Sequence, residues 1–192
     1  MRLAIINLLY TIKFKEIFNF GDEICMKKKL IIINGVMGVG KTTICKALYK
    51  KLNNSFWLDG DNCWMMNPFV ANEENKKMVL ENIAYLLNNF LKNSSSEYVL
   101  FNWVIPTDEI MNDVLDRITE KDILIYKITL MSRKDELVKR ISKDIKNGLR
   151  DKGNIKRSLE RFDLYKSMNT LKIDTTKKSV DEIVDEIIDI IK

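Results

Sequence analysis

The sequence predicts an α/β domain of three layers, in which helices cover both faces of a five-stranded parallel sheet. Short apolar runs alternate with stretches of helical periodicity from residue 30 to the end of the chain, as expected of parallel strands joined by right-handed helical crossovers. The 192 residues, 46% of them hydrophobic, suit one domain with an ordinary core. No repeat, linker or second domain is indicated.

A glycine-rich turn joins the first predicted strand, residues 30–33, to the first helix, residues 42–52. Gly35 to Thr42 follows the complete phosphate-binding pattern G-x-x-x-x-G-K-[ST]. Glycines let backbone N–H groups approach phosphate oxygens, and the helix N-terminus adds a partial positive charge. Lys41 would hold the β- and γ-phosphates, and Thr42 would bind Mg²⁺. The nucleotide-binding residues expected here are Gly35, Val36, Met37, Gly38, Val39, Gly40, Lys41, Thr42 and Thr43.

The middle of the chain continues the alternation. A short strand, residues 56–58, runs into Asp59-Gly60-Asp61-Asn62, and a long helix follows over residues 72–92. Residues 62–71 between them are too apolar for a solvated loop. A third strand is expected over residues 98–104, and a helix with early acidic residues opens at Pro106.

The remaining elements complete the sheet. A fourth strand covers residues 122–131, and Ser132 with Asp135 forms a capping-box pattern for a helix that ends at Asn147-Gly148. Residues 149–156 resemble a mobile flap, and a further helix is expected to run to about Met168. Residues 170–174 predict a fifth strand, and Ser179 caps a last helix that ends at residue 191.

Polar segments follow several of these strands and should converge on one crevice, because ligands of parallel sheets bind at the carboxyl ends of the strands. Asp59 and Asp61 follow the second strand, Asn102 and Trp103 the third, and residues 174–176 the fifth. An amide at position 102 can orient a metal-bound water but adds no negative charge. The negative charge that the chemistry needs is therefore expected to come from Asp59 and Asp61.

The chain contains no histidine, which excludes Ser-His-Asp hydrolysis, Cys-His nucleophiles and His-based zinc chemistry. A catalytic base must therefore come from another residue type, and a carboxylate is the leading candidate. One of Asp59 and Asp61 would accept the proton of an attacking hydroxyl while the other orders Mg²⁺ through water. Thr42 and Asp59 are the expected metal residues, but the sequence leaves open which aspartate is the base.

The chain resembles the small P-loop kinases, which include shikimate, gluconate and adenylyl-sulfate kinases and antibiotic O-phosphotransferases. The resemblance covers residues 26–191 and rests on the phosphate loop, on Asp59-Gly60-Asp61-Asn62, and on residues 159–165, which look like the L-x-x-R-x-P-x-Y segment of shikimate kinases with Asp163 in place of Pro. It implies the P-loop NTPase fold with strand order 2-3-1-4-5, a small lid at about residues 148–157, and ATP and Mg²⁺ as cofactors.

The same resemblance implies roles for three arginines. Arg140 would lie near the adenine, Arg150 would reach the transferring phosphate from the flap, and Arg161 would contact substrate or phosphate. The glycine triplet that holds shikimate is absent, and Cys63-Trp64 stands where adenylyl-sulfate kinases carry an Arg. Neither substrate is therefore implied for this chain.

Several large apolar residues near the second and third strands form either an acceptor pocket or part of the core. A flat apolar pocket would suit a nucleobase or an aromatic drug. The residues concerned are Trp64, Met65, Met66, Phe69 and Trp103.

The cysteine count favours a cytoplasmic protein, and the charge leaves its partner open. Three cysteines are too few for a disulfide framework, and no membrane span or signal peptide is indicated. Residues 1–25 are expected to be an extension, with the domain beginning at Met26 and running to residue 192. The net charge is +5, with eleven Lys or Arg against five Asp or Glu in residues 133–161, a basic segment that can attract nucleic acid or close over phosphates.

The sequence therefore favours an ATP-dependent phosphotransferase that acts on the hydroxyl or phosphate of a small acceptor, such as a nucleoside or nucleotide. A kinase of RNA or tRNA ends and a nucleotide-binding regulatory module without an acceptor remain as alternatives. The oligomeric state is not indicated.

Overall fold

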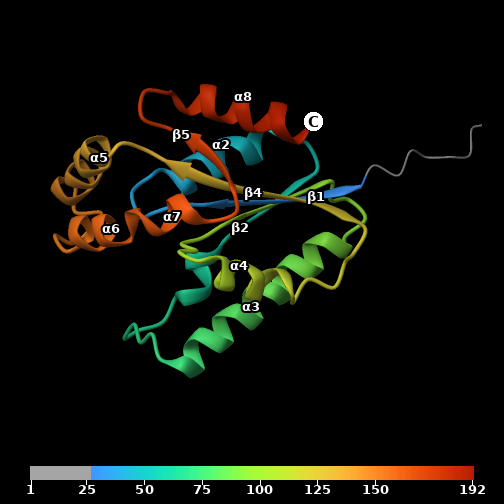
Figure 1. The fold of residues 1–192 in the computed structure, drawn as a ribbon. Coiled ribbons are helices and arrows are strands. Elements are labelled where there is room, and N and C mark those ends of the chain that lie inside the picture. Colours follow the sequence, from blue (N-terminus) through green and yellow to red (C-terminus); the bar gives the residue numbers. More distant parts are fainter. Residues whose placement is uncertain (1–26) are drawn as a thin grey trace, which may run out of the picture.

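The structure is a computed structural model and describes residues 27–192. The extension 1–25 and the expected domain start at Met26 lie outside the described residues. Five parallel strands form one sheet in the order β2-β3-β1-β4-β5 (Figure 1), which confirms the predicted α/β fold and strand order. The strands are β1 (Lys28–Asn34), β2 (Ser55–Asp59), β3 (Tyr98–Asn102), β4 (Ile123–Met131) and β5 (Leu171–Asp174).

Helices cover both faces of this sheet. In Figure 1, α2 and α8 lie above it and α3 and α4 lie below. The remaining helices are grouped near the carboxyl ends of the strands. The helices are α2 (Lys41–Lys51), η1 (Gly60–Trp64), α3 (Glu73–Lys92), α4 (Asp108–Leu115), α5 (Lys134–Lys146), α6 (Asn154–Phe162), α7 (Leu164–Ser167) and α8 (Val180–Ile191).

The central strand β1 is the most buried part of the sheet. The four residues from Leu30 to Ile33 are 0% exposed, because helices cover both faces of the strand and other strands flank both edges. A continuous apolar run is therefore required here, and it ends where the phosphate loop begins.

Strand register brings the candidate polar residues to one level. Asn102 pairs with Ile33 of β1 on one side and with Asp59 of β2 on the other. The carboxyl ends of β1, β2 and β3 therefore lie beside one another, and this edge of the sheet holds the site described below.

Some predicted boundaries were wrong. The third strand ends at Asn102 rather than at residue 104. The helix expected to run to Met168 is two helices, α6 and α7, which meet at Asp163. Residues 154–156 of the expected flap form the first turn of α6, which leaves residues 149–153 between α5 and α6.

The capping box predicted at Ser132 was also wrong. Helix α5 has Arg133 as its N-cap, with no hydrogen bond from that side chain, and the buried Ser132 hydroxyl has no hydrogen-bond partner among the described residues. The Arg133 N–H donates to Thr176 Oγ1 at 2.9 Å, which ties the start of α5 to the loop after β5. The capping box at Ser179 and Glu182 of α8 was confirmed.

Within residues 27–192, no helix combines the length and the apolar composition needed to cross a membrane.

Candidate active site

The phosphate loop is wedged between β4 and α5, and this explains two of its glycines. Gly35 and Gly38 have φ angles of 144° and 86°, which L side chains rarely adopt. A Cβ on Gly35 would lie 2.7 Å from Leu130 O, and one on Gly38 would lie 2.4 Å from Ile141 Cγ1. The loop therefore needs glycine both for its backbone angles and for its close contacts.

Lys41 is buried at the base of this loop. Its Nζ donates to Gly35 O at 2.8 Å and to Val36 O at 3.3 Å, and the residue is only 8% exposed. Burial lowers the pKa of Lys41 to about 8, although the charges of Asp61 and Asp59 act in the opposite direction. A phosphate group in the loop would offer this ammonium a stronger acceptor than the two carbonyls do.

Thr42 and Asp59 form a direct pair at the neighbouring strand end. Thr42 Oγ1 donates to Asp59 Oδ2 at 2.8 Å, and Asp59 Oδ1 accepts from the Asp61 N–H at 3.1 Å as the cap of η1. A hydroxyl and a carboxylate are oxygen ligands of the kind that Mg²⁺ uses together with nucleotide phosphates. The donor set therefore fits the expected metal.

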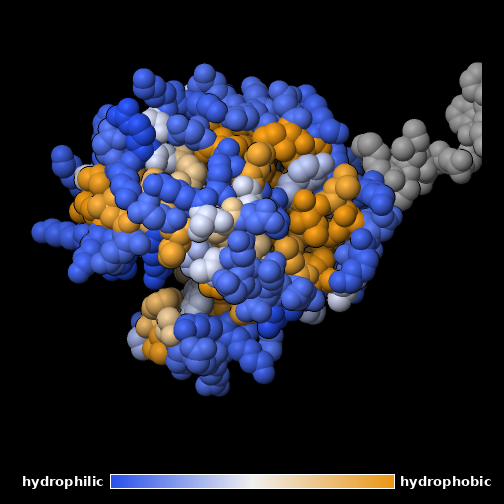
Figure 2. Space-filling view, viewed as in Figure 1, coloured by the Kyte–Doolittle hydropathy of each residue, from blue (hydrophilic) through white to orange (hydrophobic). Residues whose placement is uncertain are grey.

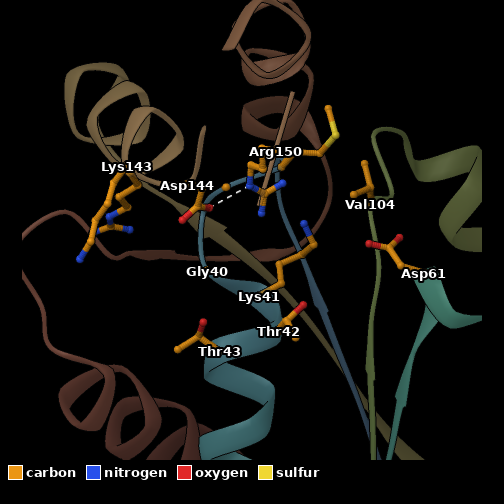
Figure 3. A pocket seen from close by; sticks show the side chains of 12 residues that line it. Gly40, Lys41, Thr42, Thr43, Asp61, Val104, Lys143, Asp144 and Arg150 are labelled. Carbon is orange, nitrogen blue, oxygen red and sulfur yellow. Dashed lines mark hydrogen bonds and ion pairs between the residues drawn. The ribbon is translucent and has the colours of Figure 1, made fainter. Parts of the chain in front are cut away.

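Asp61 projects from η1 into the cavity that Lys41 also lines (Figure 3). Burial and the charge of Asp59 raise the pKa of Asp61, whereas Lys41 and Arg150 lower it. A carboxylate with a raised pKa accepts protons more readily than an ordinary surface aspartate. The two aspartates thus differ, since Asp59 is bonded to Thr42 and Asp61 faces the cavity.

The cavity itself measures about 320 Å³ and joins the phosphate loop to η1 and to the end of α5. Most of its wall is polar or charged, and Figure 3 shows Asp144 and Arg150 above the phosphate loop with Asp61 projecting from the other side. The lining residues are Met37, Gly38, Gly40, Lys41, Thr42, Thr43, Asp61, Val104, Arg140, Lys143, Asp144 and Arg150.

Arg140, expected near the adenine, braces one wall of this cavity. Its Nη1 donates to Thr175 Oγ1 at 3.0 Å and to Val39 O at 3.3 Å, and its Nη2 donates to Thr175 O at 2.8 Å. Glu136 accepts from its Nε at 3.1 Å. The side chain thereby connects α5, the phosphate loop and the end of β5.

Arg150 lies on the opposite side of the cavity from Asp61. Its Nε donates to Asp144 Oδ2 at 2.8 Å, and both residues line the cavity (Figure 3). No sequence motif singled out Asp144. Its only signal was its position near the end of the helix that precedes Arg150, which by itself does not distinguish it from other surface acids.

Asn102 is buried at the end of β3, where it is held by Trp57, a residue that no sequence motif singled out. Trp57 Nε1 donates to Asn102 Oδ1 at 2.6 Å, and an indole can only donate, so the amide oxygen must face it. The oxygen expected to orient a metal-bound water is therefore already an acceptor from Trp57. Asn102 does not line the cavity.

The structure does not bring the expected apolar acceptor residues into one pocket. Trp103 fills the space beside Gly60, where a Cβ would lie 2.6 Å from its ring, whereas Trp64 stands against Phe69 with 5.5 Å between ring centroids. Met65 and Met66 line a separate groove of about 440 Å³ against α3. The 3₁₀ turn η1 separates these side chains, and Arg161 is exposed on α6 outside the cavity.

Comparison with known proteins relates the chain to P-loop proteins. The sequence profile of the AAA domain family matches residues 31–161. No curated protein sequence matches the chain.

Many solved structures share its fold, among them the following three. The tunicamycin resistance protein of Deinococcus radiodurans has a TM-score of 0.64 and 17% identity, with 86% of this chain and 96% of that chain covered. A gluconokinase from Sinorhizobium meliloti has a TM-score of 0.59 and 16% identity, with 84% and 89% covered. An APS kinase from Mycobacterium tuberculosis, solved with AMPPNP and APS, has a TM-score of 0.58 and 16% identity, with 86% and 98% covered. At these identities the likeness confirms the small P-loop kinase fold.

Proposed function

We propose that this chain, which belongs to the AAA domain family, is an ATP-dependent phosphotransferase that moves the γ-phosphoryl group to a small acceptor. One observation carries the proposal. A carboxylate, Asp61, enters the same cavity as the phosphate-loop Lys41 and the guanidinium of Arg150. A protein that only bound a nucleotide would not need a carboxylate at this position, where it can accept the proton of an acceptor hydroxyl.

The chemistry assigned to each group follows from its contacts. The loop amides and Lys41 bind the β- and γ-phosphates, and Thr42 with Asp59 would hold Mg²⁺, which neutralises phosphate charge when bound. Asp61 accepts the proton of the acceptor hydroxyl while the oxygen of that hydroxyl forms a bond to the γ-phosphorus. The bond from that phosphorus to the bridging β–γ oxygen breaks, and ADP leaves. Arg150 stabilises the charge on the transferred group.

The acceptor is proposed only as a class, a small molecule with a hydroxyl or phosphate, such as a nucleoside or nucleotide. The similar structures are named for different molecules, namely tunicamycin, gluconate and APS, so their names do not select one. The cytoplasm remains the expected location.

The RNA-end alternative stays the second candidate. Ion pairs of 3.1 Å or less with acids of residues 133–163 hold five of the eleven basic side chains of residues 133–161, and the segment as a whole keeps a positive charge that can attract a polyanion. The pairs are Arg133 with Asp135, Lys134 with Asp163, Arg140 with Glu136, Arg150 with Asp144 and Arg157 with Asp151.

Transfer of labelled γ-phosphate from Mg²⁺-ATP tests the proposal directly. The acceptor panel contains nucleosides, nucleotides, sugars, aminocyclitol and amphenicol drugs, and RNA with free 5′ hydroxyls. We expect label on one class of small acceptor, reduced about 10³-fold or more in Lys41→Ala because the charge on the phosphates is lost. Lys46→Ala, an exposed lysine of the same helix, is the matched control and should keep wild-type transfer.

Two results would contradict the proposal. Failure of the protein to bind ATP would remove the phosphate-loop assignment. Tight ATP binding without transfer to any acceptor, together with ATP-dependent capture of a partner protein, would favour the regulatory module.

A further inference from the structure

A second carboxylate, Asp144, lies in the same cavity, and neither a sequence motif nor the proposed reaction accounts for it. Its Oδ2 accepts from Arg150 Nε at 2.8 Å, and the two side chains are 34% and 32% exposed. A carboxylate in a cavity for phosphates repels its ligand unless a cation matches its charge. The pair with Arg150 supplies that match.

The way in which Asp144 holds Arg150 leaves most of the guanidinium available. Nε makes this hydrogen bond, and among residues 27–192 neither Nη atom donates one. The two Nη groups retain four N–H donors on adjoining edges of the fork. In Figure 3 the guanidinium lies between Asp144 and Lys41, and its charge lowers the pKa of both Lys41 and Asp61.

The backbone at the end of α5 sets this geometry. Gly148 has a φ of 71°, and the Leu149 N–H donates to Asp144 O at 2.9 Å, so the chain reverses as in other helix ends closed by a left-handed glycine. Arg150 is thereby returned alongside Asp144. Helix α5 is itself seated on the phosphate loop, since Ile141 fills the space next to Gly38.

We propose that Asp144 is a positioning residue, which holds Arg150 by Nε so that its two Nη groups face the γ-phosphate. The arginine then recognises a nucleoside triphosphate in preference to a diphosphate. This inference rests on the proposed function, because it takes the cavity as the site of the nucleotide phosphates. Without the carboxylate, the long arginine side chain would sample other rotamers and lose part of its contact with the ligand.

The ratio of two affinities tests this without an acceptor. Isothermal titration in Mg²⁺ gives the dissociation constants of AMPPNP and ADP for each variant. We expect wild type to prefer AMPPNP, and Asp144→Ala to lower that preference about tenfold while the ADP affinity stays within about twofold. Asp144→Asn keeps an oxygen acceptor for Nε and should lose less. Arg150→Ala should lower the preference at least as far, and adding Asp144→Ala to it should cause no further loss.

Asp151→Ala is the matched control, because it removes a nearby exposed aspartate that pairs with Arg157. It should leave the AMPPNP preference unchanged. Thermal unfolding of every variant tests whether the fold is retained.

Each of three outcomes overturns the inference. The first is an Asp144→Ala protein that keeps the full preference while Arg150→Ala loses it. The second is an Asp144→Ala protein that binds AMPPNP more tightly than wild type, and the third is an Arg150→Ala protein that behaves as wild type. A wild-type protein that binds neither nucleotide would instead refute the proposed function. If the protein transfers phosphate but Asp144→Ala leaves its AMPPNP preference unchanged, only the positioning role is refuted.

Discussion

The two sides of the active-site crevice are built very differently. On the nucleotide side, Gly35 and Gly38 contact neighbouring elements with no room for a Cβ, Lys41 is 8% exposed, and Arg140 bonds to two loops. On the other side, residues 60–72 carry large apolar side chains in solvent. Met65 is 84% exposed and Phe69 64%, and Figure 2 shows apolar atoms gathered at the lower left, over the loop before α3.

This contrast separates a side of the crevice whose residues are constrained by packing from a side whose apolar residues are exposed. The nucleotide side is sterically determined, because Gly35 and Gly38 contact β4 and α5 with no room for a Cβ. The opposite side leaves apolar surface uncovered, and such surface beside a site is typical of ligand contact. Its side chains are therefore expected to affect the choice of acceptor and to contribute little to stability.

The largest effect that tests this contrast is expected at Asp61, where the two sides meet. Asp61→Asn should lower the rate of phosphate transfer about 10²- to 10⁴-fold, because the amide cannot accept the acceptor's proton. ATP affinity should change little. Single-turnover transfer and nucleotide titration measure the two quantities, with Asp113→Asn on α4 as the control. Equal losses in ATP binding and transfer would place Asp61 on the nucleotide side instead.

A smaller effect, on stability, is expected from the loop glycines. Gly38→Ala should lower the free energy of unfolding by about 2–4 kcal/mol, because it combines a clash with Ile141 and an unfavourable φ. Gly40 also has a positive φ, 110°, but a Cβ there would have nothing within 4 Å. Gly40→Ala should therefore lower the free energy of unfolding by about half as much. Urea denaturation gives both values. Equal losses would show that backbone strain alone matters and that α5 is not seated tightly on the loop.

The pH dependence of nucleotide affinity tests the buried ammonium. Burial lowers the pKa of Lys41 to about 8, and phosphate binding requires the charged form. ATP affinity should therefore be fully present below this pKa and fall as the pH rises above it. The decrease should be at most tenfold per pH unit, because one proton is involved.

Lys41→Arg is the control for this pH dependence, because its guanidinium stays charged. Its affinity, whatever its absolute value, should not change between pH 7.5 and 9.5. A wild-type affinity equally flat over that range would contradict the lowered pKa.

The smallest effect is expected on the open side. Phe69→Ser should change the free energy of unfolding by less than about 1 kcal/mol, because Phe69 is largely exposed. It should raise the KM for the acceptor about three- to tenfold and leave the KM for ATP unchanged. Leu124→Ser is the control, an exposed apolar residue near the amino end of β4. A large loss of stability in Phe69→Ser would show that this loop belongs to the core.

The sequence by itself determined the strand, turn and helix of the phosphate loop and the alternation of strands and helices along the chain, whereas the strand order of the sheet was implied by the resemblance to P-loop kinases. These features depend on contacts between neighbours in the chain: apolar periodicity, glycine spacing and the capping of α8 at Ser179. The same local reasoning failed at Ser132, where the tie between Arg133 and the loop after β5 replaced the predicted cap.

Only the tertiary structure decided how the side chains of the site are paired. Trp57 meets Asn102 because β2 and β3 pair in one register, and Asp144 meets Arg150 because a left-handed glycine reverses the chain after α5. Trp64 and Trp103, both near strand ends, are separated by the turn of η1. Such pairings depend on strand register and on the direction of a turn, and residue type and spacing specify neither.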